Sequence, residues 1–267
     1  MFNFFVVYNV EEYKKKLLLA MTIFSLHIWW ITIAPTWYGL MYALSFLIGL
    51  FFIQREFAEK DADTLFFATI LWVILGWRFG YVLFYNLGYY LTNPLEIFMP
   101  WKGGMSFHGG ALGVVIAWIF AARKIHKPFL VVADKMVWII PIGLFFWRIG
   151  NYINGELLGM VGYNWPFARV VDGVSYFPTP LLESLLEGVL LFVLLLWKKK
   201  NIAYPGQVWV WFLAGYGMLR FATEFIRNPD VQIGYLFGTS WLTLGQIFCL
   251  AMILVAVILS LILNKKH

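Results

Sequence analysis

The sequence contains very little cysteine and histidine. Its one cysteine among 267 residues is Cys249, which excludes an internal disulfide and any CxxC metal site. The four histidines are scattered at His27, His108, His126 and His267, without the spacing typical of metal ligands. We therefore expect neither a metal ion nor a cofactor.

Charge is also scarce. Charged residues make up 13% of the chain, whereas apolar residues make up 62% and aromatic residues 20%. This balance excludes an ordinary soluble domain, in which about a quarter of the residues are charged. A helix crosses a bilayer core with about 20 consecutive apolar residues. We therefore expect an all-α, polytopic integral membrane protein with seven transmembrane helices, at Thr36–Gln54, Thr64–Gly88, Gly103–Ala122, Phe129–Trp147, Leu181–Trp197, Pro205–Ile226 and Gly234–Leu263.

The N-terminal region allows two interpretations. Leu17–Ala34 is apolar enough for an eighth transmembrane helix anchored by Lys14–Lys16. However, the chain would then have to reverse almost at once before the next span, and His27 with the neighbouring tryptophans suits a segment lying on the outer membrane surface. We favour an N-terminal interfacial segment over residues 1–35, without a cleaved signal peptide, and one transmembrane domain over residues 36–267.

The formal net charge of +6 raises the question of a nucleic-acid partner. The basic residues lie mainly between the predicted spans, and cytoplasmic connections of membrane proteins are rich in lysine and arginine. One alternating set of connections carries ten of them, at Arg55, Lys60, Arg123, Lys124, Lys127, Lys198, Lys199, Lys200, Lys265 and Lys266; the other carries four, at Lys102, Arg148, Arg169 and Arg227. We therefore expect no nucleic-acid partner, a cytoplasmic C-terminus, and an outer start of the first span.

Several ionisable residues lie where the predicted spans reach the outer side. They are His108, Arg148, Glu183, Glu187, Arg220, Glu224 and Arg227, with Arg78 somewhat deeper in its span. Charge within hydrocarbon is costly, by about 2.5 to 17 kcal/mol. Each arginine could simply pair with a carboxylate and connect two helices, or the set could line a cavity in the outer leaflet. Because arginine forks bind phosphate in a bidentate manner, the number of arginines favours a cavity for a phosphate-bearing ligand.

Two polar, glycine-rich stretches accompany these charges, Gly103–Gly110 before the third span and Arg148–Gly159 after the fourth. Glycine lets the backbone approach a ligand closely. Gly109 and Gly113 also match the small-xxx-small pattern of packed transmembrane helices, and packing is the interpretation that we favour for them. The asparagines of the second stretch either shape a turn and helix cap or bind a ligand.

These stretches resemble those of a known family, the prolipoprotein diacylglyceryl transferases. The family signature, Arg-x-Gly-Asn-aromatic-x-Asn-x-Glu-x-x-Gly, is matched by Arg148, Gly150, Asn151, Tyr152, Asn154, Glu156 and Gly159. Further blocks follow in the family order: Trp37–Tyr42, Arg78–Asn86, Gly103–Gly110, and Tyr216–Phe221 with Glu224–Asp230. The resemblance extends from about Thr36 to the C-terminus.

The resemblance implies transfer of the sn-1,2-diacylglyceryl group from phosphatidylglycerol to the lipobox cysteine thiol of a prolipoprotein signal peptide. The products would be a thioether and glycerol phosphate, in the first step of bacterial lipoprotein maturation. It further implies an enzyme of the bacterial cytoplasmic (inner) membrane, with a catalytic domain over residues 36–267 and an active site toward the outer leaflet. Phosphatidylglycerol, the prolipoprotein and the lipid bilayer would be its partners.

The resemblance also implies roles for individual residues. Arg148 and Arg220 would stabilise the charge that develops on the departing glycerol phosphate. Because a cysteine thiol with a pKa of ~8.5 is mostly protonated at neutral pH, His108 would act as the general base. The predicted substrate-binding residues are Tyr38, Arg78, Asn151, Asn154, Glu156, Gly159, Glu183, Tyr216 and Glu224.

Alternatives remain open for the base and for the class of protein. The arginine field alone could lower the pKa of the thiol, with His108 positioning substrate, or His108 could be satisfied by backbone groups at its helix end. Cys249 lies near the middle of its predicted span, so we expect no covalent intermediate on it. A transporter would distribute ionisable residues across the membrane, whereas only Asp134 and Lys135 depart from the outer level. A scaffold without chemistry would explain neither the arginines nor the ordered blocks.

The chain departs from the family pattern in four places. Tyr152 replaces the usual phenylalanine, and Trp147 replaces a small residue and would crowd that helix end. Phe177–Glu183 lacks the glutamine and tyrosine that the family often has there, and the loop Val161–Tyr176 is short for the family. Headgroup contacts of those two residues and peptide recognition by that loop therefore do not carry over.

Overall fold

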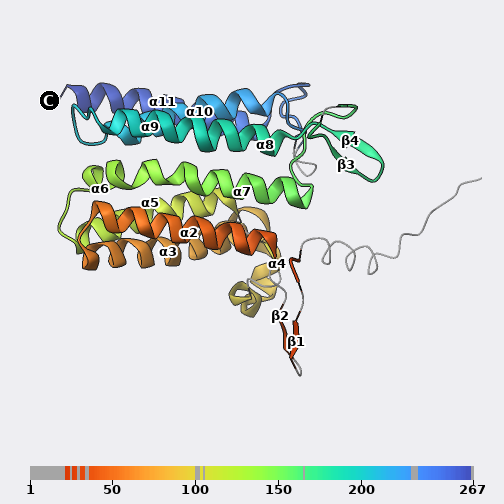
Figure 1. Ribbon diagram of the computed structural model, residues 1–267, viewed down its shortest axis with the longest axis horizontal. Coiled ribbons are helices and arrows are strands. Elements are labelled where there is room, and N and C mark those ends of the chain that lie inside the picture. The colour runs from red at the N-terminus through yellow and green to blue at the C-terminus, as the bar shows by residue number, and fades with distance from the viewer. Residues whose placement is uncertain are drawn as a thin grey trace, which may run out of the picture.

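The computed structural model describes most of the chain from residue 22 onward (Figure 1). The described residues are 22–24, 26–28, 31–33, 36–99, 103–104, 106–164, 166–229 and 234–265, with only the backbone described for residues 26–28, 31–33 and 107–108. The long helices run side by side along the longest dimension of the molecule, and the β hairpins lie at one end of them. We call this end the hairpin end.

Helices form most of the described chain. In order they are α2 (Trp37–Glu56), α3 (Glu59–Tyr85), α4 (Leu87–Thr92), η1 (Pro94–Phe98), α5 (Phe107–Lys124), α6 (Phe129–Met136), η3 (Val137–Ile139), α7 (Ile140–Asn154), α8 (Thr179–Glu183), η4 (Ser184–Leu190), α9 (Leu191–Lys199), α10 (Gln207–Glu224) and α11 (Leu244–Asn264). The segment η3 is 3₁₀-helical and precedes Pro141, which has no N–H to continue the α-helical ladder. The segment η4 is π-helical and joins α8 to α9.

Within the described residues, five helical segments are long and apolar enough to cross a membrane, which supports five of the seven predicted spans. They are Trp37–Glu56, Glu59–Tyr85, Phe129–Asn154, Thr179–Lys199 and Leu244–Asn264. The other two predicted spans form α5 and α10, of 18 residues each, in the same bundle. Neither of these two helices is among the described helices that are long and apolar enough to cross a membrane, so their crossing stays a prediction.

The described chain is mostly helical, as expected, with two short hairpins in addition, and one of these corrects the eighth helix. β1 (Leu26–Ile28) and β2 (Ile31–Ile33) are antiparallel, with Leu26 opposite Ile33. A continuous helix over Leu17–Ala34 is therefore wrong, because β-branched residues in this stretch favour extended backbone. A second hairpin pairs β3 (Arg169–Val171) with β4 (Val174–Tyr176). Lys14–Lys16 lie outside the described residues, and the interfacial location of residues 1–35 stays a prediction.

A buried apolar cluster holds the helices together between their ends. Its fully or almost fully buried members include Leu65 of α3, Trp118 of α5, Leu191 of α9 and Val208 of α10. Packing of this kind leaves little freedom for one helix to slide along its neighbour. The polar residues at the helix ends are consequently held at fixed depths.

α3 and α5 approach each other so closely that only glycine fits at their contact. A Cβ on Gly109 would lie 2.1 Å from the carbonyl oxygen of Gly76, and one on Gly113 would lie 2.1 Å from that of Trp72. The packing interpretation of Gly109 and Gly113 is therefore confirmed. Close approach of this kind increases the van der Waals contact that drives helix association in lipid.

We expect Gly109→Ala to lower the free energy of unfolding by about 1–3 kcal/mol, because α3 and α5 would have to separate to admit the methyl group. Thermal unfolding in detergent measures the change. Gly143→Ala is the matched control, since Gly143 lies within α7 and a Cβ there meets nothing within 4 Å. Equal stability of the two variants would contradict the close helix contact.

The two charged residues that depart from the outer level have structural partners. Asp134 accepts hydrogen bonds from the backbone N–H groups of Gly206, at 2.6 Å, and Trp209, at 3.0 Å, and so caps the start of α10. Lys135 donates to the backbone carbonyl of Glu56 at 3.2 Å. These contacts explain both charges without a conduction path. The two charges were the sequence feature that favoured a transporter.

α11 begins at Leu244, whereas the predicted span began at Gly234. Thr243 is the N-cap: its hydroxyl accepts from the N–H of Gln246 at 3.2 Å, and the Gln246 side chain accepts from the N–H of Thr243 at 2.9 Å. This reciprocal capping box fixes the start of the helix. Cys249 therefore lies in the second turn of α11, which corrects its expected place near the middle of a span.

Candidate active site

The signature stretch Arg148–Gly159 forms the end of α7 and the loop after it. Gly155 caps the helix with a φ of 71°, in the left-handed region that glycine adopts without strain. The N–H of Glu156 then donates to the carbonyl oxygen of Asn151 at 2.9 Å, so the chain turns back on its own helix. The residues of the signature are therefore spaced as a helix end with its C-terminal cap requires, and this cap brings Glu156 close to Asn151.

Arg148 connects α7 to the segment formed by α8 and η4. Its Nη1 lies 3.0 Å from Oε2 of Glu183, and its Nη2 lies 3.0 Å from Oε2 of Glu187. Arg148 is 2% exposed and both glutamates are 0% exposed. Trp147, which was expected to crowd this helix end, lies beside the guanidinium, with 4.6 Å from the Arg148 Cζ to a Trp147 ring centroid. A buried guanidinium is favourably placed beside an aromatic ring.

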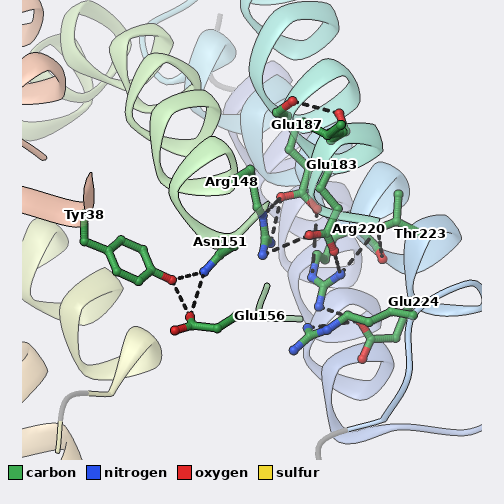
Figure 2. Close-up of polar contacts among 12 residues, drawn as sticks. Tyr38, Arg148, Asn151, Glu156, Glu183, Glu187, Arg220, Thr223 and Glu224 are labelled. Carbon is green, nitrogen blue, oxygen red and sulfur yellow. Dashed lines mark hydrogen bonds and ion pairs between the residues drawn. The ribbon is translucent and has the colours of Figure 1, made fainter. Parts of the chain in front are cut away.

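The two glutamates come from a helix that changes its geometry between them. Glu183 is the last residue of α8, and Glu187 lies in the π-helical segment η4. Pro180 lies in the first turn of α8, where its missing N–H costs no hydrogen bond. π-Helical turns occur frequently at functional sites, and here both carboxylates reach the same guanidinium (Figure 2).

Arg220 on α10 extends this ion-pair network. Its Nη1 lies 2.5 Å from Oε1 of Glu183, and its Nη2 lies 2.5 Å from Oε2 of Glu224. Glu224 also accepts a hydrogen bond of 3.0 Å from the hydroxyl of Thr243, the N-cap of α11. Glu183 is thus shared by Arg148 and Arg220, and the network joins α7, α8, α10 and α11 at the hairpin end (Figure 2).

The network is formally neutral, whereas the sequence led us to expect an excess of arginine at this level. It consists of Arg148, Arg220, Arg227, Glu183, Glu187 and Glu224. A sequence shows which charges share a depth but not which helix faces converge, so this pairing was not predictable. Each guanidinium has five N–H donors, whereas each carboxylate offers only two oxygens, and the carboxylate of Glu183 is shared by two arginines. An entering anion can therefore compete for arginine donors within the network.

A second polar cluster lies beside Arg148, toward α2. The hydroxyl of Tyr38 donates to Oε2 of Glu156 at 2.6 Å and accepts from Nδ2 of Asn151. Gly150 makes room for the tyrosine ring, because a Cβ there would lie 3.0 Å from it. Figure 2 shows the Tyr38–Asn151–Glu156 cluster on one side of Arg148 and the glutamates on the other.

The side-chain amides of the two signature asparagines have unused hydrogen-bonding capacity. Among the described residues, Nδ2 and Oδ1 of Asn154 and Oδ1 of Asn151 have no hydrogen-bond partner, although these atoms are shielded from solvent. An unpaired buried polar group costs about 1–3 kcal/mol. Gly155 accounts for the turn and cap, so the amides are candidates for contacts with a polar ligand.

Arg78 lies apart from the network and organises a loop. Its Nε donates to the carbonyl oxygen of Ile97 at 2.8 Å, and its Nη1 donates to those of Gly103, at 2.6 Å, and Gly104, at 3.1 Å. Its Nη2 donates to the carbonyl oxygen of Glu96. The guanidinium is thus engaged by backbone acceptors, and a direct contact with substrate stays a prediction.

Gly159 and Tyr216, also predicted to bind substrate, are both buried. A Cβ on Gly159 would lie 2.2 Å from Oγ1 of Thr179 and 2.6 Å from the carbonyl oxygen of Ile226, so this glycine allows close packing of the loop. Tyr216 lies one turn before Arg220 on α10 and is close enough to it and to Arg148 for electrostatic interaction. Binding of substrate by either residue stays a prediction.

The backbone of His108 lies in the first turn of α5, which Ser106 caps by accepting from the N–H of Gly109 at 3.3 Å. Nothing is described of the histidine side chain. The N–H of Ser106 donates to the carbonyl oxygen of Trp77 at 2.9 Å, so the start of α5 lies beside the C-terminal part of α3. The role of His108 as a base or in positioning stays a prediction.

Two features of the site were not assigned a role in it from the sequence. Glu187 was noted as an outer charge, but its Oε2 accepts from both Nε, at 3.2 Å, and Nη2, at 3.0 Å, of Arg148. Thr243, in the pattern Thr-x-x-Gln, supports Glu224. A cavity of about 280 Å³ also lies at the hairpin end, and none of the predicted site residues lines it. Its lining is Gly155, Leu157, Leu158, Val171, Tyr176, Arg227, Asn228 and Pro229.

Comparison with known proteins gives one consistent result. The family model described as prolipoprotein diacylglyceryl transferase matches residues 24–262. Relatives named phosphatidylglycerol--prolipoprotein diacylglyceryl transferase include those of Hydrogenovibrio crunogenus, 46% identical over 82% of this chain and 86% of the relative, and Nitratidesulfovibrio vulgaris, 47% identical over 84% and 89%. The relative from Geobacter sulfurreducens is 40% identical over 86% and 91%. With its apolar helices, the chain is a multi-pass membrane protein that belongs to the prolipoprotein diacylglyceryl transferase family.

Proposed function

We propose that this protein transfers the sn-1,2-diacylglyceryl group of phosphatidylglycerol to the lipobox cysteine of a prolipoprotein. The observation that carries the proposal is the buried network in which Arg148, from the family signature, and Arg220 share Glu183 at one end of an apolar bundle. Phosphatidylglycerol carries one phosphodiester charge, and its departing glycerol phosphate develops a second. Arginines held in place before the reaction stabilise this developing charge with little reorganisation.

The reaction forms a C–S bond between the cysteine sulfur and the glycerol carbon that carries the phosphate. The bond from that carbon to the phosphate oxygen breaks, and glycerol phosphate leaves with the electron pair. The thiol proton goes to a base, for which His108 is our candidate because a histidine pKa of ~6.5 suits proton transfer near neutral pH. No covalent intermediate on Cys249 is part of this scheme.

The two polar clusters would bind different parts of the lipid headgroup. Arg148 and Arg220 would face the phosphate, with Glu183 and Glu224 keeping the two guanidinium groups in position. Asn154 and the Tyr38–Asn151–Glu156 cluster would bind the glycerol hydroxyls. Oδ1 of Asn151 and both side-chain amide atoms of Asn154, which have no hydrogen-bond partner among the described residues, support this role. Arg78 would act at a distance, by shaping the loop that precedes α5.

The proposal includes an orientation in the bacterial cytoplasmic membrane. Seven helices would cross it, with the hairpin end and an active-site cavity toward the outer leaflet and the C-terminus in the cytoplasm. Both substrates can reach that side, since a translocated lipobox and outer-leaflet lipid meet there. A cysteine introduced near the end of α11 should be protected from an impermeant thiol reagent in intact cells, and labelling there would contradict this orientation.

Purified protein incubated with phosphatidylglycerol and a lipobox peptide tests the reaction directly. We expect a thioether-linked diacylglyceryl peptide and an equal amount of glycerol phosphate. The same peptide with serine in place of the lipobox cysteine is the control and should give neither. If the wild-type protein formed no product under conditions in which an active control enzyme did, the proposed function would be rejected.

Tyr38→Phe should reduce kcat/KM for phosphatidylglycerol by about 10- to 100-fold, because a hydrogen bond to a charged group is worth roughly 1.5–3 kcal/mol. The variant removes the hydroxyl that joins Asn151 to Glu156. Tyr42→Phe is the control, since Tyr42 stacks on Tyr38 one turn later and its hydroxyl forms no hydrogen bond with a described residue. Equal activities of the two variants would contradict a role for the cluster.

A further inference from the structure

The end of the bundle opposite the hairpins carries a groove between α3 and α5. Its volume is about 390 Å³, within the range of about 300–1,000 Å³ that is usual for ligand sites. Lys60, Thr64, Phe67 and Leu71 of α3 line one wall, and Phe120 and Lys124 of α5 line the other. This groove is separate from the charged network, which lies at the hairpin end (Figure 1).

Polarity changes along the groove. Lys60 and Lys124 lie at one end of it, and α3 then rises about 16 Å to Leu71, at 1.5 Å per residue. Phe67, Leu71 and Phe120 are 65%, 56% and 51% exposed. In a helix that spans a bilayer, exposed residues of this kind face hydrocarbon. The groove is therefore cationic at its membrane-surface end and open to lipid along its length.

The groove lysines differ from their neighbours at this end of the bundle. Lys127 is paired with Asp61 at 2.8 Å, and Lys199 is paired with Glu56. Neither Lys60 nor Lys124 forms an ion pair with any residue that the structure describes. Their two ammonium groups are thus available to an external anion.

We propose that this groove binds an anionic phospholipid. The phosphate lies between Lys60 and Lys124, and an acyl chain runs along Phe67, Leu71 and Phe120. With Asp63, which also lines the groove, the lysines leave a net charge of +1, which complements the net negative charge of an anionic lipid headgroup. Basic pockets between transmembrane helices bind anionic lipid headgroups in this way. The bound lipid connects α3 to α5. This role is separate from the transfer reaction proposed for the hairpin end.

The test uses the full-length protein, delipidated in neutral detergent, with phosphatidic acid, phosphatidylcholine or phosphatidylethanolamine added. Native mass spectrometry measures the apparent affinity for each lipid. We expect Lys60→Gln with Lys124→Gln to weaken binding of phosphatidic acid by about tenfold or more, because each surface lysine contributes to anionic lipid binding. Diacylglyceryl transfer should be unchanged, which separates this proposal from the function of the network.

Arg123→Gln with Lys200→Gln is the matched control. It removes the same charge from exposed residues at the same end that do not line the groove, and it should leave the affinity unchanged. Equal affinity of the groove variant and the wild type for phosphatidic acid would overturn the proposal, as would binding of phosphatidylcholine as tight as that of phosphatidic acid. Asp63→Asn should preserve or strengthen binding of phosphatidic acid. The proposal would also be overturned if the wild-type protein bound phosphatidylethanolamine more tightly than phosphatidic acid and Asp63→Asn abolished that binding.

Discussion

Arg148→Gln should reduce the rate of diacylglyceryl transfer by about 10³-fold, the upper range for loss of one preorganised donor to a developing anion. The side chain contacts two fully buried glutamates, so its removal also leaves Glu183 and Glu187 without their common partner. Breaking a buried ion pair in this way costs about 3–5 kcal/mol of stability. Transfer assays and thermal unfolding in detergent measure the two effects separately.

A compensated variant separates catalysis from stability. Arg148→Gln combined with Glu187→Gln removes a charge of each sign, so stability should return in part while activity should not. Recovery of activity together with stability would show that Arg148 only holds helices together. Lys199→Gln is a control at the other end of the bundle: it breaks a partly exposed ion pair with Glu56, should cost about 1 kcal/mol or less, and should leave transfer unchanged.

His108→Gln should lower kcat/KM by about 10²- to 10⁴-fold if the histidine is the general base, because this is the usual contribution of a positioned base. A base acts in its unprotonated form, so the wild-type rate should rise as pH increases through the histidine pKa and then level off. The variant should lose this rise. Rate measurements from pH 5 to 9 test both expectations.

His126→Gln is the matched control, since His126 lies in the exposed turn after α5, at the opposite end of that helix. It should leave both the rate and the pH profile unchanged. A His108→Gln variant that keeps the wild-type pH profile with a raised KM would assign the histidine to substrate positioning. In that case the positive charge of the arginines would itself lower the pKa of the substrate thiol.

The sequence predicted most of the helices because long apolar runs specify membrane spans almost alone. It placed α11 ten residues too early, since Gly234 lies in an apolar stretch, yet the pattern Thr243-x-x-Gln246 marks the true start at Leu244. It also missed the hairpin at Leu26–Ile33, where the same apolar composition serves strand pairing instead of a helix. Hydrophobicity therefore indicated the long spans, but neither their exact ends nor the choice between helix and strand in the N-terminal run.

The candidate site was predictable in its members but not in its pairing. Arg148, Glu183, Arg220 and Glu224 were expected at one depth, and the structure brings them into one network. Arg78 was expected beside them but donates to backbone carbonyls of the loop before α5, a distinction that depends on side-chain direction. Helix position gives depth, whereas the choice between carboxylate, carbonyl and ligand depends on contacts between distant parts of the chain.

The π-helical segment η4 acts as a one-residue register offset between two fixed contacts. On one side Glu183 meets both arginines, and on the other side Lys199, at the end of α9, pairs with Glu56. If the seven residues of η4 formed ordinary α-helix instead, α9 would turn by about 100° relative to α8. The chain could then keep the glutamate contacts or the lysine contact, but not both. The extra residue thus lets one continuous helical segment satisfy two partners, one near each of its ends.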